Sequence, residues 1–246
     1  DIVTKVGIIG IVNGLSSKEL PKISKRILLD VIQFVKDGRK EDNLNELIEM
    51  IRLHAFKFIE DNKSSFKSNL KKLRYTHSGD RKQMTALLFI LYNKGKGNTY
   101  QFTKPSLEHF EPNNIPQGGT GYYKGPDRDE LIHSIGNMIL MKSKLNSRLQ
   151  NYNIKTKIEK IDSDSAFKNE VFFTHDIYKN LVKSSAIKGD TTVYKGFPDI
   201  TKCYTSKSVP KKELFEKRTD FYVSNLLEMI CSSNNYLLSG DKHVEI

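Results

Sequence analysis

The spacing of apolar residues predicts that the first part of the chain is helical. Apolar residues recur every three or four positions over residues 20–37 and again over residues 43–62, the period of a helix with one buried face. A shorter helix is expected around Phe66 and Leu70, and a further one over residues 81–92, where the 86–92 segment is apolar nearly all round. We therefore expect residues 1–95 to form a helical region that acts as a linker or cap.

The pattern changes after the Gly-rich segment 93–101. Two short strand-like segments, residues 106–110 and 137–141, are separated by a long stretch rich in Gly and Pro. Helical spacing returns in the segments that follow, over residues 143–150, 153–161, 176–183 and 214–230. Pro210 is expected to be the first residue of the last of these helices. We expect residues 96–246 to form a second domain, closed by this last helix. The predicted fold class is mainly α with a small β component.

Composition narrows the functional classes. The chain has 246 residues, and 40 Lys and Arg against 29 Asp and Glu give a net charge of +11, which favours a polyanionic partner such as DNA. A Lys-rich sequence also arises from genomic base composition, so charge alone leaves nucleic-acid binding open. Cys203 and Cys231 are the two cysteines; they exclude a disulfide-stabilised scaffold and indicate a cytoplasmic protein. No apolar run approaches the roughly 20 residues of a membrane span. Because the chain begins at Asp1, we expect it to be part of a longer protein.

Four polar residues stand out by order and spacing. Glu108 and His109 lie in the first strand-like segment, SLEHFEP. Asn137 begins the second, GNMILM, and Asn146 follows nine positions later in a predicted helix. Taken singly, each has an ordinary interpretation as a surface pair, a turn residue or a helix-start residue. Their occurrence together, in this order, favours a catalytic site.

This arrangement resembles the His-Me finger (HNH, ββα-metal) nuclease motif. More closely, residues 80–232 resemble the C-terminal nuclease domain of the GmrSD family of type IV restriction enzymes, which matches Lys157 and Arg218 to further family positions. The resemblance implies a helical bundle around a ββα-metal motif. It also implies a DNA endonuclease or nickase that acts in restriction of phage or foreign DNA.

The resemblance assigns roles that agree with the chemistry of phosphodiester hydrolysis. His109 is expected to be the general base, because neutral imidazole can accept a proton from water near neutral pH. Glu108 and Asn146 are expected to supply oxygen ligands to Mg²⁺ or Mn²⁺. Asn137 is expected to reach back to the first loop and orient His109. In a regular strand Glu108 and His109 point to opposite faces, so a bulge or the strand end is needed for both to serve one site.

Basic residues near the predicted site form a second group. Lys142, Lys144 and Arg148 flank the predicted site helix and are candidates to hold the DNA backbone. Lys157 is expected either to do the same or to pair with an acidic neighbour, and Arg218 to pair inside the fold. His133 is interpreted as a partly buried structural histidine, with contact to the phosphate as the alternative.

Other functions remain open from the sequence. Members of the GmrSD family carry an upstream ParB-like nucleotide-hydrolysing half, and nothing here matches a Gly-x-x-x-x-Gly-Lys-Ser/Thr phosphate loop. We therefore expect that half to lie in a missing upstream domain or in a separate subunit. The alternatives to a DNA endonuclease are a non-catalytic nucleic-acid-binding module and an RNA-directed nuclease toxin.

Overall fold

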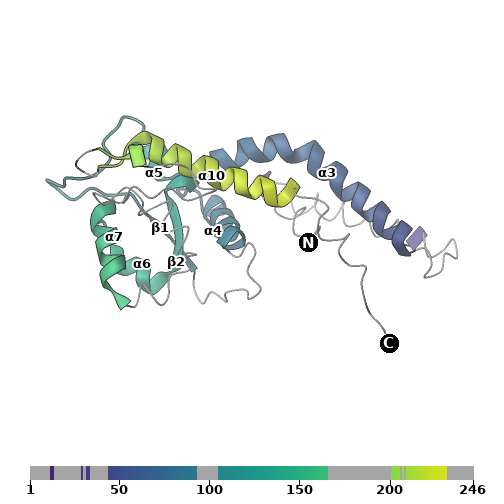
Figure 1. The fold of residues 1–246 in the computed structure, drawn as a ribbon, viewed down its shortest axis with the longest axis horizontal. Helices are drawn as coiled ribbons and strands as arrows, with labels where there is room; N and C mark the ends of the chain where they lie inside the picture. The colour runs from purple at the N-terminus through teal and green to yellow at the C-terminus, as the bar shows by residue number, and fades with distance from the viewer. Residues whose placement is uncertain are drawn as a thin grey trace. The chain divides into compact units, whose positions relative to one another are not determined.

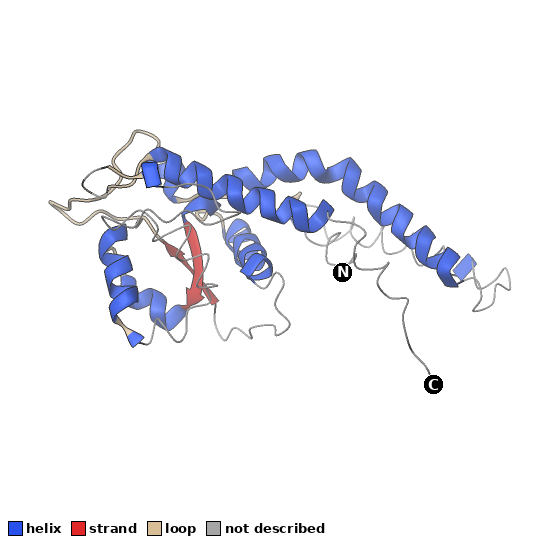
Figure 2. Ribbon diagram, in the orientation of Figure 1, coloured by secondary structure: helices blue, strands red, loops and turns tan. Residues whose placement is uncertain are grey.

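The computed structural model of the chain describes residues 12–13, 29, 32–33, 44–92, 105–165, 201–205, 207 and 209–231. This part is mainly helical with one two-stranded antiparallel sheet (Figures 1 and 2). Contacts divide the chain into two compact units, residues 1–70 with 226–246 and residues 71–225. The expected domain boundary near residue 95 stays a prediction.

The first unit is dominated by α3, which runs from Leu44 to Lys72 and whose last two residues belong to the second unit. The sequence predicted two helices here, but the structure has one. The polar stretch between them does not interrupt the helix. The side-chain Nδ2 of Asn62 donates to the Phe58 carbonyl at 2.8 Å, one turn back. The buried stripe therefore continues through Ile59, Phe66 and Leu70. The helices expected at 20–37 and 176–183 lie largely or wholly outside the described residues.

The second unit is built on a β-hairpin-like sheet. Strand β1 (Pro105–His109) pairs antiparallel with β2 (Met138–Lys142), and the register places His109 opposite Met138. Residues 138–141 are all buried, as expected for a strand covered on both faces. Both strands lie within one residue of their predicted positions.

Helices cover this sheet. Helix α4 (Ser78–Tyr92) and helix α6 (Ser143–Leu149) each lie against both strands. Helix α7 (Ile154–Ser163) follows, and its N-cap Asn153 accepts a hydrogen bond from the Thr156 amide at 2.9 Å, which satisfies one of the unpaired donors of the first turn. The predicted helices at 81–92, 143–150 and 153–161 are confirmed.

The long connection between the strands is ordered by one arginine. It contains a short helix, α5 (Arg128–Ile132), and a 3₁₀ turn, η2 (Ile135–Asn137). The Arg128 guanidinium donates to a Glu111 carboxylate oxygen at 3.1 Å, to the Tyr123 carbonyl at 3.0 Å and to the Pro112 carbonyl at 2.5 Å. One side chain thus joins both halves of the connection.

The last helix, α10 (Lys212–Cys231), begins after Pro210 rather than at it. Pro210 instead forms an isolated antiparallel bridge with Tyr204, flanked by hydrogen bonds from the Thr205 and Lys211 amides at 2.8 Å each. This bridge does not need the N–H that proline lacks. Within the second unit, four residues of α10 are completely inaccessible to solvent: Leu214, Phe215, Arg218 and Tyr222.

Among the described helices, none combines the length and the apolar character that crossing a bilayer requires.

Gly136 allows η2 to lie directly against α10. A Cβ at this position would collide with the Phe215 carbonyl oxygen and with Thr219. A helix backbone cannot give way as a flexible side chain can, so this contact requires glycine.

We expect Gly136→Ala to lower the free energy of unfolding by about 1–3 kcal/mol or more, because the added methyl group forces apart η2 and α10. Gly79→Ala is the matched control, since a Cβ there meets nothing within 4 Å and alanine favours a helix. Urea denaturation of both variants checks this expectation. Equal stability of Gly136→Ala and wild type would show that the close approach is not a constraint.

Candidate active site

His109 is the last residue of β1, and its ring contacts two other rings. Its Nε2 is 3.1 Å from Nδ1 of His133. The ring of Tyr75 meets it edge-on, with a centroid distance of 4.3 Å. Burial, followed by the neighbouring His133, lowers the pKa of His109 to about 3. His109 is therefore neutral at cellular pH, which is the form that accepts a proton.

Glu108 lies on the opposite face of β1. The pairing is regular through Glu108–Ile139 and His109–Met138, so the strand has no bulge at this point and successive side chains alternate. The buried Glu108 carboxylate meets the Lys157 ammonium, with 2.5 Å between Oε1 and Nζ. His109 is the final residue of the strand, so of the two expected alternatives the structure has the strand end and not a bulge. That both side chains serve one site stays a prediction.

Lys157 is the cation of this buried pair. Its side chain is 1% exposed, and its ammonium also donates to the His109 carbonyl at 2.6 Å. Burial raises the pKa of Glu108 to about 6, against the opposing effect of Lys157, and burial lowers the pKa of Lys157. The Lys157 ammonium does not reach the surface, which does not favour the expected contact with DNA. The alternative, pairing with an acidic neighbour, is what the structure has.

Asn137 makes three buried hydrogen bonds to backbone. Its Oδ1 accepts from the Glu111 amide, and its Nδ2 donates to the carbonyls of Glu111 and Ile132, all at 2.8 Å. It lies in η2, immediately before β2, rather than in the strand as expected. Asn137 reaches the first loop, as the sequence indicated. Its hydrogen bonds fix the backbone two residues after His109 and one residue before His133. Its role in orienting His109 stays a prediction.

Asn146 in α6 binds the same strand from the other end. Its Nδ2 donates to Ser106 Oγ at 2.7 Å and to the Leu107 carbonyl at 3.1 Å. Ser106 and Glu108 are two residues apart and share one face of β1. The structure therefore brings Asn146 and Glu108 to one face of the strand, with His109 directed to the other.

The carboxylate of Glu108 and the amide oxygen of Asn146 are the kinds of ligand that a hard divalent cation prefers. Lys157 occupies Oε1 of Glu108, which leaves Oε2, and the hydrogen bonds of Asn146 use its nitrogen, which leaves Oδ1. No group of three or more His, Cys, Asp or Glu side chains suited to a metal occurs among the described residues. Mg²⁺ commonly takes only one or two protein oxygens and fills its remaining positions with water and substrate phosphate, so two such oxygens suffice.

Comparison with known proteins identifies the family. The sequence model described as GmrSD restriction endonucleases, C-terminal domain, matches residues 60–182, half of the chain. The chain belongs to this family. No curated protein and no solved structure matches it. The GmrSD match includes all four residues singled out by spacing and all of the hairpin-to-α7 region.

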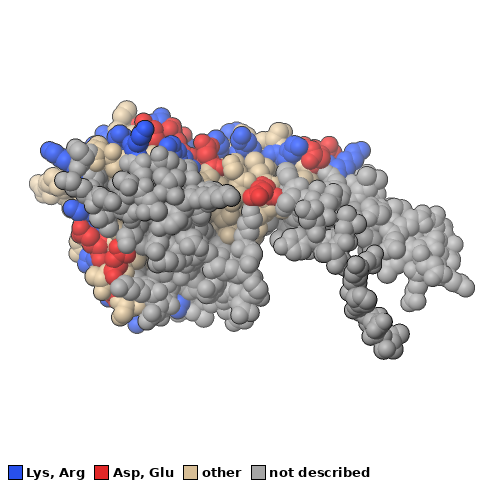
Figure 3. Space-filling view, viewed as in Figure 1, with Lys and Arg blue, Asp and Glu red and all other residues tan. Residues whose placement is uncertain are grey.

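The basic residues around α6 of this GmrSD domain differ in their surroundings. Lys144 is exposed, Lys142 is half-buried, and Arg148 forms an ion pair with Asp164. Over the described part of the face in Figure 3, basic and acidic side chains are interleaved. Contact of Lys142, Lys144 and Arg148 with DNA stays a prediction.

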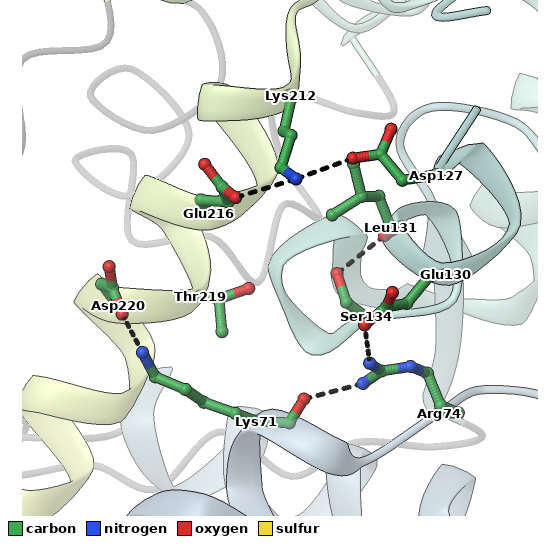
Figure 4. Close-up of a pocket in the computed structure, with 10 residues that line it drawn as sticks. All are labelled: Lys71, Arg74, Asp127, Glu130, Leu131, Ser134, Lys212, Glu216, Thr219 and Asp220. Carbon is green, nitrogen blue, oxygen red and sulfur yellow. Dashed lines mark hydrogen bonds and ion pairs between the residues drawn. The ribbon is translucent and has the colours of Figure 1, made fainter. Parts of the chain in front are cut away.

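A polar pocket in the same unit is self-neutralised (Figure 4). Its three cations all have carboxylate partners: Lys71 pairs with Asp220, Arg74 with Glu130, and Lys212 with Asp127 and Glu216. Four carboxylates against three cations do not attract a polyanion. This pocket therefore offers no excess positive charge to a polyanion.

Sequence reasoning missed the residues that surround His109. His133 was assigned a structural role, and Tyr75 carried no signal at all. Glu111 and Arg128 form a buried ion pair at 3.1 Å. Glu111 lies in the EHFEP segment, two residues after His109, so this segment was the one sequence signal for these neighbours.

Arg218 lies inside the fold as expected and donates to the Met138 carbonyl at 3.4 Å.

Lys157→Met tests the buried pair. We expect it to lower the free energy of unfolding by about 3–5 kcal/mol, because Glu108 is left buried without a counterion. The double variant with Glu108→Gln should recover part of this loss. Urea denaturation measures both effects, and Lys155→Met, at an exposed position of the same helix, is the control. Equal losses in the single and double variants would contradict the pairing.

Glu111 gives a pH-dependent test. Burial raises its pKa from 4.5 to about 7, and its Oε2 has no hydrogen-bond partner among the described residues. The folded chain therefore holds a proton that the unfolded chain releases at lower pH, and the contribution of this group to stability falls as pH rises from 4.5 to 7. Glu111→Gln cannot ionise. We expect its stability relative to wild type to increase between pH 5 and pH 8 in urea denaturation; a constant difference would contradict the shift.

Proposed function

We propose that this chain is the nuclease part of a restriction protein and hydrolyses phosphodiester bonds in DNA, with His109 as the general base. The observation that carries the proposal is the neutral, enclosed His109 at the end of β1, in a GmrSD-family domain. Glu108 is its neighbour in the chain on the opposite face of the strand, and Asn146 lies on the same β1–β2–α6 segment. The order of two antiparallel strands and a helix supports the ββα-metal interpretation of this segment.

In this mechanism His109 accepts a proton from the attacking water. The water oxygen bonds to phosphorus, and the bond from phosphorus to one sugar oxygen breaks. That oxygen leaves with the electron pair of the broken bond and takes up a proton from solvent water to become a hydroxyl. A pKa of about 3 in the free protein makes a weak base, but the negative charge of a bound phosphate favours the imidazolium and raises that pKa. General-base catalysis of this kind contributes about 10²- to 10⁴-fold.

The other residues hold the reacting groups. Glu108 and Asn146 would bind Mg²⁺ or Mn²⁺, which supplies charge stabilisation to the phosphate when bound. Lys157 keeps Glu108 in its carboxylate form and fixes the His109 carbonyl. Asn137 holds the loop that follows His109.

The biological setting follows from the family. We propose that the substrate is phage or otherwise foreign DNA in the cytoplasm, and that an upstream ParB-like nucleotide-hydrolysing domain or subunit works with this chain. Lys142, Lys144 and Arg148, next to the site on α6, are proposed to contact the DNA backbone.

Cleavage of supercoiled plasmid tests this function. We expect wild type to convert the plasmid to nicked or linear forms with Mg²⁺ or Mn²⁺ and not with EDTA. His109→Ala should reduce the rate at least about 100-fold, because the base is lost. His77→Ala, at an exposed histidine of the same unit, should leave the rate unchanged.

Other outcomes discriminate the alternatives. Unchanged cleavage by His109→Ala would exclude this mechanism. Digestion of RNA with DNA left intact would favour the RNA-directed toxin. Salt-sensitive DNA binding without scission, equal in wild type and His109→Ala, would favour the non-catalytic binding module.

A further inference from the structure

Among the described residues, His133 makes the one side-chain hydrogen bond to the His109 ring. The bond joins Nε2 of His109 to Nδ1 of His133 at 3.1 Å. His133 follows α5, on the connection between the two strands, and is outside the set of Glu, His and Asn residues that carries the family resemblance. Its contact with the proposed base therefore needs its own explanation.

The rings around His109 form a clamp, defined here as Tyr75 and His133. These two rings are nearly parallel, with 13° between their planes and 6.3 Å between centroids. The His109 ring stands almost perpendicular to both, at 71° to Tyr75 and 83° to His133. An imidazole held edge-on against two parallel rings cannot rotate freely about its side-chain bonds.

Backbone contacts hold the clamp itself. The Tyr75 amide donates to the His133 carbonyl at 2.9 Å, and Arg74 forms an isolated bridge with Ser134. Asn137 fixes the residue before His133 and the second residue after His109. The 3.1 Å separation between the two imidazoles is thus set by backbone on both sides.

A hydrogen bond between two neutral imidazoles restricts where their protons lie. Each neutral ring carries one proton, so one ring donates and the other accepts. If His133 donates to Nε2 of His109, the His109 proton lies on Nδ1, and no lone pair remains for water. If His109 donates from Nε2, its Nδ1 keeps a lone pair, and His133 must be protonated on Nε2. The second arrangement alone makes His109 a base.

We propose that His133 is a positioning residue that holds His109 with its proton on Nε2 and leaves Nδ1 as the atom that accepts the proton of water. A hydrogen-bond acceptor behind the base fixes its tautomer and ring angle in the same way that a carboxylate does in other catalytic sites. This inference rests on the proposed nuclease function, because the Nε2 tautomer is the one that makes His109 a base.

Nitrogen NMR of the ¹⁵N-histidine-labelled full chain tests the tautomer. In wild type we expect His109 to show a protonated Nε2 and an unprotonated Nδ1. His133→Phe keeps a flat ring against Tyr75 but removes the acceptor, and we expect the His109 signals to shift toward a mixture of tautomers. His133→Asn returns an oxygen close to the position of Nδ1 and should restore the wild-type pattern. A wild-type spectrum with the His109 proton on Nδ1 overturns the proposal.

Plasmid cleavage by the same variants tests the consequence. We expect kcat for His133→Phe to fall about 10- to 100-fold with KM unchanged, and His133→Asn to regain activity. An unaltered kcat in His133→Phe overturns the positioning role. If wild type shows the Nε2 tautomer and His133→Phe loses it, yet no variant cuts DNA or RNA, the positioning contact stands and the nuclease function fails. Thermal unfolding of each variant separates these effects from loss of fold, and His77→Phe is the control.

Discussion

The three hydrogen bonds of Asn137 are the constraint on which the candidate site depends. One carboxamide holds the amide and carbonyl of Glu111 and the carbonyl of Ile132, each at 2.8 Å. An aspartate could accept but not donate, and an alanine could do neither, so both carbonyls would be left buried without partners at about 1–3 kcal/mol each. The bonded backbone lies close to His109 and His133 in the chain, so Asn137 contributes to how the two imidazoles are placed.

A second feature of the candidate site is that its charged side chains form buried ion pairs and are not exposed on the surface. Glu108 with Lys157 and Glu111 with Arg128 are ion pairs whose carboxylates are almost inaccessible to solvent, and both carboxyl pKa values are raised by burial. Two positive charges near His109 add to burial in holding its pKa low. The net charge of +11 therefore says little about the site, because the cations that define it are enclosed and already paired.

The elements of the second unit could be predicted from sequence because their hydrophobic periods are local. The strands, α4, α6 and α7 follow directly from apolar spacing, and the order of Glu108, His109, Asn137 and Asn146 located the site. The sequence predicted two helices where the structure has the single helix α3, because the polar residues around Asn62 interrupt the apolar pattern. In the structure the Asn62 side chain forms a hydrogen bond within the helix. The sequence allowed an acidic partner for Lys157 and a structural role for His133, but it could not identify the residue that either side chain contacts. Their partners lie 49 and 24 residues away.

Lys157 also bears on how the proposed site would treat a divalent ion. Its ammonium is fixed at Oε1 of Glu108 and at the His109 carbonyl, so a metal at the remaining oxygen would share one carboxylate with an existing positive charge. Two cations on one carboxylate repel each other, and the low dielectric of a buried site strengthens that repulsion. A bound phosphate would supply the missing negative charge. On this reasoning the carboxylate alone would be a weak metal site, and Glu108 would hold an Mg²⁺ or Mn²⁺ ion only together with a phosphate.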